Sequence, residues 1–217
     1  MTIFYIDTSS STLYSGIYSN NSLKAYVKKP LGKDMSKYAL NEVNLMFERV
    51  NLKPNDIDKI IVVSGPGSFT GIRIGMTIAK IFAFSLKKEI TTISSLEAMM
   101  LSVNTDKIKV PIIDARRGYV YAGVYKNNNI LKENQYIKLD ELMSFLDSLN
   151  EEYIFITNDS KLDNLNRVKY SPDILNIIKN VKDKENINPH LVEPVYLKLT
   201  EAEENLGSIV YDNRVEN

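Results

Sequence analysis

A repeated pattern of strand, aspartate-containing turn and hairpin sets the strongest limit on how this chain can fold. The stretch FYIDTSSSTLYSGIY at residues 4–18 returns in outline as VPIIDARRGYVYAGVY at residues 110–125. In both stretches an apolar segment ends at an aspartate, and a β-rich hairpin pattern follows the turn. The repeat predicts two related lobes, which we place at residues 1–104 and 105–200, with a polar helix or tail over residues 201–217.

The segments around the repeats alternate between strand and helix patterns. In the first half, three short strands precede a helix near residues 34–50, a buried strand, a helix over 69–86 and another strand over 89–94. The second half adds a strand, a hairpin, a helix, a strand and a last helix, with Ser171 as its N-cap and Pro172 at its first position. This order predicts the α/β class, with mixed sheets covered by helices.

Composition excludes several kinds of catalytic site. The chain has no cysteine and one histidine, His190, so thiol nucleophiles, disulfides and metal sites built on cysteine or paired histidines are excluded. Basic and acidic residues number 27 each, so no overall field attracts nucleic acid, and an RNA contact would need a local patch. The N-terminus lacks a signal-peptide pattern and no segment is expected to span a membrane, which predicts a cytoplasmic protein.

The two aspartates of the repeat are candidates for a nucleotide site. In a duplicated nucleotide-binding fold, such aspartates position Mg²⁺ while the turn amides hold phosphate. Here the first turn has hydroxyl side chains instead of glycine, and the second has two arginines. Two interpretations remain: a working site, or a degenerate site in which the aspartates cap local amides. The degenerate site consists of Asp7, Thr8, Ser9 and Asp114.

The motif SGPGSFTGIRIG at residues 64–75 joins an apolar strand to a long helix. It matches neither a P-loop nor a dinucleotide fingerprint, and its proline removes an amide that a phosphate cradle would use. Interior glycine costs a helix about 1 kcal/mol relative to alanine, so these glycines need a packing reason. The small residues either pack on the protein's own sheet or dock another subunit. They recur every fourth position, at Gly67, Gly71, Gly75, Ala79 and Ala83.

Several motifs together resemble one known family. They are IDTSSST, SGPGSFTGIRIG, ISSLEAM, DARRGYVYAGVY and PVYLKLTEAE, in that order between about residues 3 and 204. The chain resembles TsaB, the accessory subunit of bacterial tRNA threonylcarbamoyladenosine synthesis. The resemblance implies a two-lobed fold related to actin, sugar kinases and Hsp70. It also implies a non-catalytic subunit, without a cofactor of its own, in a complex whose other subunits use ATP and a metal.

The resemblance also implies partners and a binding surface. The partners would be the catalytic subunit TsaD and the ATPase TsaE, with tRNA reached through the complex, which modifies N6 of the adenosine beside the anticodon. A homodimer is expected when the chain is alone. The partner surface would lie on the two helices that follow the N-terminal hairpins, and we expect it to include Tyr38, Val43, Phe47, Gly71, Arg73, Ile74, Gly75 and Ile78.

Two other functions stay open at this point. A nucleotide-dependent phosphotransferase or ATPase on the same fold would use the aspartate turns with Mg²⁺. A self-associating homodimer would use the same helices without a partner. A peptidase has no support in the residues, because nothing near the serines of the glycine turn could act as a base.

Overall fold

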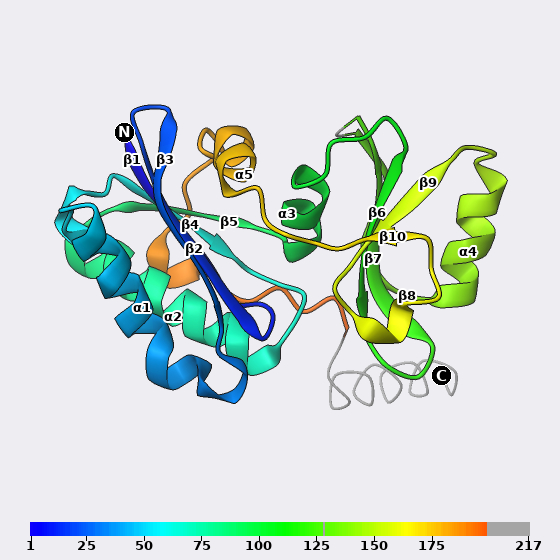
Figure 1. The fold of residues 1–217 in the computed structure, drawn as a ribbon, viewed down its shortest axis with the longest axis horizontal. Coiled ribbons are helices and arrows are strands. Elements are labelled where there is room, and N and C mark those ends of the chain that lie inside the picture. The colour runs from blue at the N-terminus through cyan, green and yellow to red at the C-terminus, as the bar shows by residue number, and fades with distance from the viewer. Residues whose placement is uncertain (128, 199–217) are drawn as a thin grey trace, which may run out of the picture.

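The computed structural model describes residues 1–127 and 129–198, which form two lobes, each built on a five-stranded sheet (Figure 1). The first sheet has the order β3-β2-β1-β4-β5. Its strands β1, β4 and β5 run parallel, whereas β2 is antiparallel to both of its neighbours. The strands are β1 (Thr2–Asp7), β2 (Thr12–Ser19), β3 (Ser22–Pro30), β4 (Lys59–Val63) and β5 (Glu89–Ile93).

The second sheet repeats this topology, which confirms the predicted duplication. From one edge its order is β8-β7-β6-β9-β10, with the antiparallel hairpin first and the parallel strands after it. Thus β6 corresponds to β1, and the aspartates that end these two strands are equivalent. The strands are β6 (Ile108–Asp114), β7 (Tyr119–Lys126), β8 (Asn129–Lys138), β9 (Tyr153–Ile156) and β10 (Arg167–Val168).

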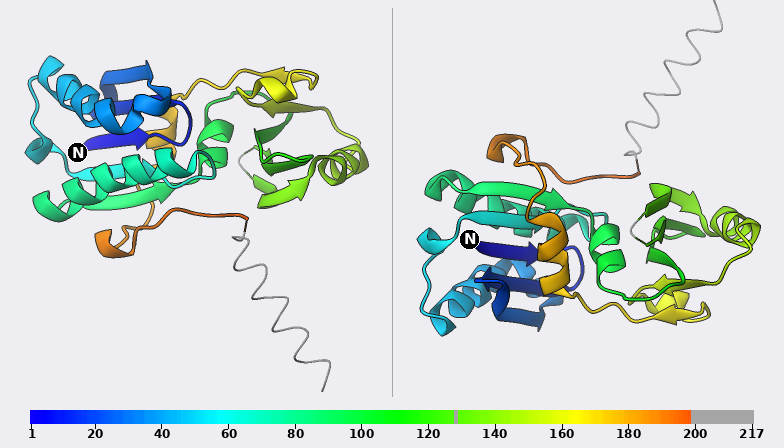
Figure 2. Two further views of the ribbon diagram at one scale, coloured as in Figure 1. Left: turned by 90° about the horizontal axis from the view of Figure 1, so that it is seen from below. Right: turned by 90° about the horizontal axis from the view of Figure 1, so that it is seen from above.

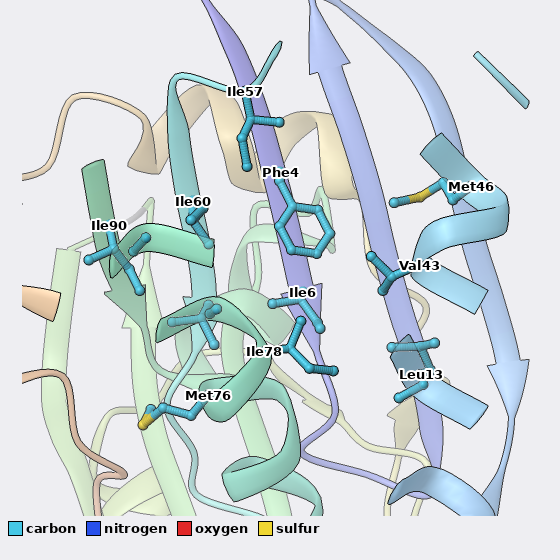
Figure 3. Packing of buried hydrophobic residues seen from close by; sticks show 14 of the residues in the cluster. Phe4, Ile6, Leu13, Val43, Met46, Ile57, Ile60, Met76, Ile78 and Ile90 are labelled. Carbon is cyan, nitrogen blue, oxygen red and sulfur yellow. The ribbon is translucent and has the colours of Figure 1, made fainter. Parts of the chain in front are cut away.

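Helices cover both faces of the first sheet. Because side chains alternate along β1, Phe4 and Ile6 face α1 (Met35–Arg49) and α2 (Phe69–Leu86), as Figure 3 shows for the core between them. Ile3 and Tyr5 point to the opposite face, where α5 (Ile174–Val181) packs. Figure 2 shows α5 on the face of this sheet away from α1 and α2. Both faces are therefore buried, which explains the continuous apolar runs of β1 and β4.

The second sheet has its main core on one face. There α4 (Leu139–Ser148) packs against alternate residues of β6 and β7, such as Val110 and Val120. The short helix α3 (Ser95–Leu101) lies on the other face and contacts β6 and β7. Leu96 and Met99 of α3 join Ile156 of β9 in a small cluster between the lobes.

The chain returns to the first lobe after β10, with α5 (Ile174–Val181). Apolar residues of α5, Ile174 and Ile177 among them, pack with Ile3 and Tyr5 of β1. The predicted start of this helix was wrong: its N-cap is Asp173, because the Asp173 carboxylate accepts a hydrogen bond from the Asn176 amide at 2.9 Å. The division at residues 104 and 105 remains a proposal, to which we add that residues 174–192 belong with the first lobe. The predicted segment 201–217 lies outside the described residues.

The helix α2 is unusually apolar. By length and composition it could cross a membrane, with a mean hydropathy of 1.4, contrary to the expectation that no segment could. Instead, 39% of it is buried in the protein, and it packs on β4, β1 and α1 as a core helix. Packing in the core does not explain the apolar side chains of α2 that remain exposed.

Candidate functional site

The turn after β1 is joined directly to the backbone of α2. The Thr8 hydroxyl donates a hydrogen bond to the Gly71 carbonyl at 2.7 Å and accepts one from the Gly75 amide at 3.0 Å. Gly71 and Gly75 are one helical turn apart, so a single hydroxyl bridges two backbone groups that a helix normally pairs with each other. Such an approach needs a helix surface without side chains.

The glycines of the motif are explained by this contact. A Cβ on Gly71 would overlap the Thr8 carbonyl oxygen, and a Cβ on Gly75 would overlap the Thr8 hydroxyl. Gly67 is likewise covered by the Ser9 backbone. Of the two interpretations of the glycines, these contacts therefore support packing inside the chain's own first lobe.

The carboxylate of Asp7 is buried beneath this turn. It accepts a hydrogen bond from the Ser9 amide at 2.8 Å, the local capping that the sequence suggested as one interpretation. Burial raises the pKa of Asp7, and the Ser9 bonds only partly oppose this effect. Burial also raises the pKa of Tyr5 and Tyr170 well above the usual range, with the Asp7 charge as the second cause. Asp7 thus lies in an environment that disfavours its charge.

Asp114, the equivalent residue of the second lobe, has the opposite environment. Its carboxylate accepts hydrogen bonds from Lys161 Nζ at 2.7 Å and from the Arg116 amide at 3.0 Å. Burial works to raise the pKa of Asp114, but these two hydrogen bonds and the nearby positive charges outweigh it and hold the pKa below its usual value. The Lys161 ammonium therefore takes the place beside Asp114 that a bound cation would need.

A cleft of about 720 Å³ separates the two turns. One wall carries Ser9, Ser10 and Ser11, and the other carries Asp114 and Arg116. Within the described residues, no three acidic or histidine side chains are grouped as they would be to hold a metal. The carboxylates that line the cleft are Asp114, which is already paired with Lys161, and Asp159. Asp7 lies beneath the first turn and is not part of the lining.

The structure places the predicted partner residues in two groups. Tyr38 and Arg73 are exposed and Ile74 is half-buried, as expected of a binding surface. The others are buried within the first lobe, where they face the sheet or the Thr8 turn, and their part in partner binding stays a prediction. These are Val43, Phe47, Gly71, Gly75 and Ile78.

The exposed faces of the same helices carry apolar residues that the sequence analysis missed. Leu45 of α1 is 37% exposed, and Ile81 and Phe84 of α2 are 56% and 63% exposed. For Ile81 and Phe84, the signal in the sequence is their position opposite the small residues of α2. Arg73 is already engaged: its guanidinium lies 3.7 Å from the centre of the Phe69 ring, and its Nε donates to the Tyr196 hydroxyl at 3.0 Å.

Comparisons with known proteins agree with this architecture. The family model of TsaD, tRNA N6-adenosine threonylcarbamoyltransferase, matches residues 30–205. The chain is 33% identical over 221 residues to the tRNA threonylcarbamoyladenosine biosynthesis protein TsaB of Bacillus subtilis, covering 94% of this chain and 96% of that protein. The TsaB of Escherichia coli is 27% identical over 131 residues, covering 59% of this chain and 56% of that protein.

Solved structures show the same fold. A protein of Pseudomonas aeruginosa described as similar to the peptidase YeaZ superposes with a TM-score of 0.79 at 18% identity, covering 91% of this chain and 99% of that one. YeaZ of Pseudomonas aeruginosa superposes with a TM-score of 0.69 at 16% identity, covering 90% of this chain and 99% of that one.

The two sheets of equal topology and the cleft between their aspartate turns define a two-lobed α/β protein. Within that class, the chain belongs to the TsaB family.

Proposed function

We propose that this chain is the non-catalytic accessory subunit of a complex that attaches a threonylcarbamoyl group to N6 of the adenosine beside the tRNA anticodon. In this role it binds TsaD, holds it in its active form and allows TsaE to engage. It works in the cytoplasm and has no cofactor of its own. The family supports the pathway, and the arrangement of exposed side chains on α1 and α2 supports the binding role.

The observation that carries the proposal is an apolar surface over these two helices, which we call the helix-pair surface. Tyr38 and Leu45 are seven residues apart on α1, and Ile74 and Ile81 are seven apart on α2, so each pair lies along one side of its helix. The helices pack together through the rings of Phe47 and Phe82, whose centres are 6.4 Å apart. Exposed apolar side chains grouped in this way are typical of a protein interface.

The aspartate turns support a scaffold rather than a working phosphotransferase. A Mg²⁺-nucleotide needs carboxylates that are charged and free to bind the metal. Asp7 is buried with a raised pKa, and Asp114 is paired with Lys161. Binding of a partner through the helix-pair surface needs neither Asp7 nor Asp114 to hold a nucleotide.

The test is co-purification with TsaD and TsaE of the same source, followed by a tRNA modification assay. Leu45→Arg with Ile81→Arg should abolish complex formation and modification, because two charges cannot be buried unpaired in an interface. Ile130→Arg is the matched control, since Ile130 is 53% exposed on the second lobe. Asp7→Ala with Asp114→Ala should leave modification intact.

Two outcomes would contradict the proposal. A complex that survives the helix-pair substitutions would show that TsaD binds elsewhere. A complex that forms with the double aspartate variant but modifies no tRNA would show a working nucleotide site in this chain. The isolated chain should elute as a dimer that dissociates when TsaD is added, and Leu45→Arg should shift it to a monomer.

A further inference from the structure

The second lobe carries a row of tyrosines that the proposed scaffold role does not use. Tyr119 and Tyr121 point the same way from β7, and Tyr121 is paired in register with Tyr136 of β8. The rings of Tyr119 and Tyr136 are stacked, with centres 4.6 Å apart and planes 6° apart, and Tyr121 is tilted against Tyr136 at 5.6 Å. All three are partly exposed. We call these residues the tyrosine face.

Positive charges border the tyrosine face. The ammonium of Lys138 lies 6.0 Å from the centre of the Tyr119 ring, and that of Lys198 lies 5.5 Å from the centre of the Tyr136 ring. The exposed Arg116 and Arg117 form the turn just before β7, where the Tyr119 amide donates to the Arg116 carbonyl at 3.0 Å. Aromatic rings and cations are thus interleaved over one end of this sheet.

The charge of this region differs from that of the whole chain. Basic and acidic residues are equal in number overall, but between residues 115 and 138 the only acidic residue is Glu133, against Arg116, Arg117, Lys126, Lys132 and Lys138. Lys126 is paired with Glu151 and Lys132 lies over Phe145 of α4, so the cations of this segment beside the rings are Arg116, Arg117 and Lys138. The neighbouring Asp114 is neutralised by Lys161. The acidic start of α4 belongs to the helix that covers the opposite face of the sheet.

Core packing does not account for these residues. Val120, Ala122 and Ile137, which alternate with the tyrosines, bury their side chains against α4. Tyr119 and Tyr136 belong to no buried cluster of the described residues, and Tyr121 only borders the small cluster around Leu96. Cross-strand aromatic pairs stabilise a sheet by themselves, so a contribution to stability is the competing explanation.

We propose that the tyrosine face binds RNA, with the rings stacking on unpaired bases and the surrounding cations contacting phosphates. A sheet with exposed aromatic rings is a common platform for single-stranded RNA, because every base offers a face for stacking. Arginine and lysine add affinity for the backbone that does not depend on sequence. The inference rests on the proposed function, since the RNA would be the tRNA substrate of the complex.

The experiment is a fluorescence anisotropy titration of a labelled, unmodified tRNA transcript with the reconstituted complex. Tyr136→Leu should weaken binding about tenfold, the loss expected for one stacked base, and Tyr136→Phe should restore it. Arg116→Asn with Arg117→Asn should weaken binding at physiological salt. It should also make the slope of log affinity against log salt concentration less steep, by the amount expected for about two lost phosphate contacts. Asparagine is chosen because both positions have positive φ, at 68° and 55°.

Matched controls lie on the first lobe. Tyr26→Leu removes an aromatic ring that is 63% exposed on β3, and Lys24→Gln with Lys28→Gln removes two exposed charges from the same strand. These variants should bind tRNA like the unaltered chain. Equal losses in controls and test variants would overturn the proposal, because binding would then follow total charge alone.

A second outcome would also overturn it. Test variants that bind tRNA normally but co-purify poorly with TsaD or TsaE would show that the face contacts a protein. If no complex forms even with the unaltered chain, the proposed function has failed, and titration of the isolated chain with the same tRNA still tests the tyrosine face. If Tyr136→Leu does not fold, the arginine variants decide, because those side chains project from an exposed turn.

Discussion

The hydroxyl of Thr8 accepts a hydrogen bond from the backbone amide of Gly75 at 3.0 Å and so joins the end of β1 to the middle of α2. The same hydroxyl donates to the Gly71 carbonyl, which places a side chain of the turn between two groups of the helix ladder. This contact determines which residues α2 can carry on its inner face, and it keeps the turn closed against the helix.

Gly75→Ala should destabilise the first lobe. The added Cβ would overlap the Thr8 hydroxyl, and overpacking of this kind costs about 1–3 kcal/mol, more than the ~1 kcal/mol that alanine gains in helix propensity. Thr8→Ala should reduce this loss in the double variant, because it removes the overlapping atom. Urea unfolding of the four proteins measures the coupling. Additive effects of the two substitutions would show that Thr8 and Gly75 are not in contact.

Asp7→Asn should stabilise the protein at pH 7. Burial raises the folded-state pKa of Asp7 above its unfolded value, so the charged form opposes folding at neutral pH. Asparagine keeps an acceptor for the Ser9 amide without the charge, and the gain should be about 1–3 kcal/mol, the usual cost of a buried group with incomplete hydrogen bonding. The gain should vanish as the pH falls through the raised pKa toward the unfolded value, because the native carboxyl is then neutral.

Thermal melts between pH 3 and pH 8 check this dependence. Asp114→Asn is the matched variant, and its effect on the stability of the fold should have the opposite sign. The pKa of Asp114 is lowered, so its pairing with Lys161 stabilises the fold above the unfolded pKa and ceases to do so as the pH falls through the folded one. Its partner is largely exposed, so the loss at pH 7 should be below about 1 kcal/mol. A loss of stability for Asp7→Asn at pH 7 would contradict the prediction, because it would show that the folded state favours the charged carboxylate.

Lys59→Met should weaken the attachment of α5. The Lys59 ammonium is buried in the first lobe and donates to the carbonyls of Lys182 and Lys184, at 2.9 and 2.8 Å, at the end of that helix. Methionine keeps the length of the side chain but leaves these carbonyls unpaired, which should cost about 1–3 kcal/mol. Hydrogen exchange should show faster exchange in residues 174–184, whereas Lys24→Met, at an exposed position, should change nothing.

Much of the fold could be predicted from local patterns. The repeat around Asp7 and Asp114 indicated two sheets of equal topology, and the helix over residues 69–86 begins and ends where its pattern indicated. The spacing of Gly71 and Gly75 showed that something approaches α2 closely, but spacing carries no information on what that is. The answer is Thr8, more than sixty residues earlier in the chain, and only tertiary structure brings it there.

The candidate surfaces were harder to predict for a related reason. Apolar periodicity marks the face of a helix that is buried, whether by its own sheet or by a partner, so Val43 and Phe47 could be assigned to either. The exposed Leu45 and Ile81 interrupt that periodicity and were overlooked. The pairing of Lys161 with Asp114 joins residues 47 positions apart and has no local signal in the sequence.

The return of α5 to the first lobe has a consequence for the order in which the chain can fold during synthesis. The face of β1 that carries Ile3 and Tyr5 is among the first parts made, yet the helix that covers it ends at Val181. A ribosome must complete the second sheet before that apolar face can be covered. Until then the nascent first lobe exposes it to any chaperone, or to any aggregating chain, nearby.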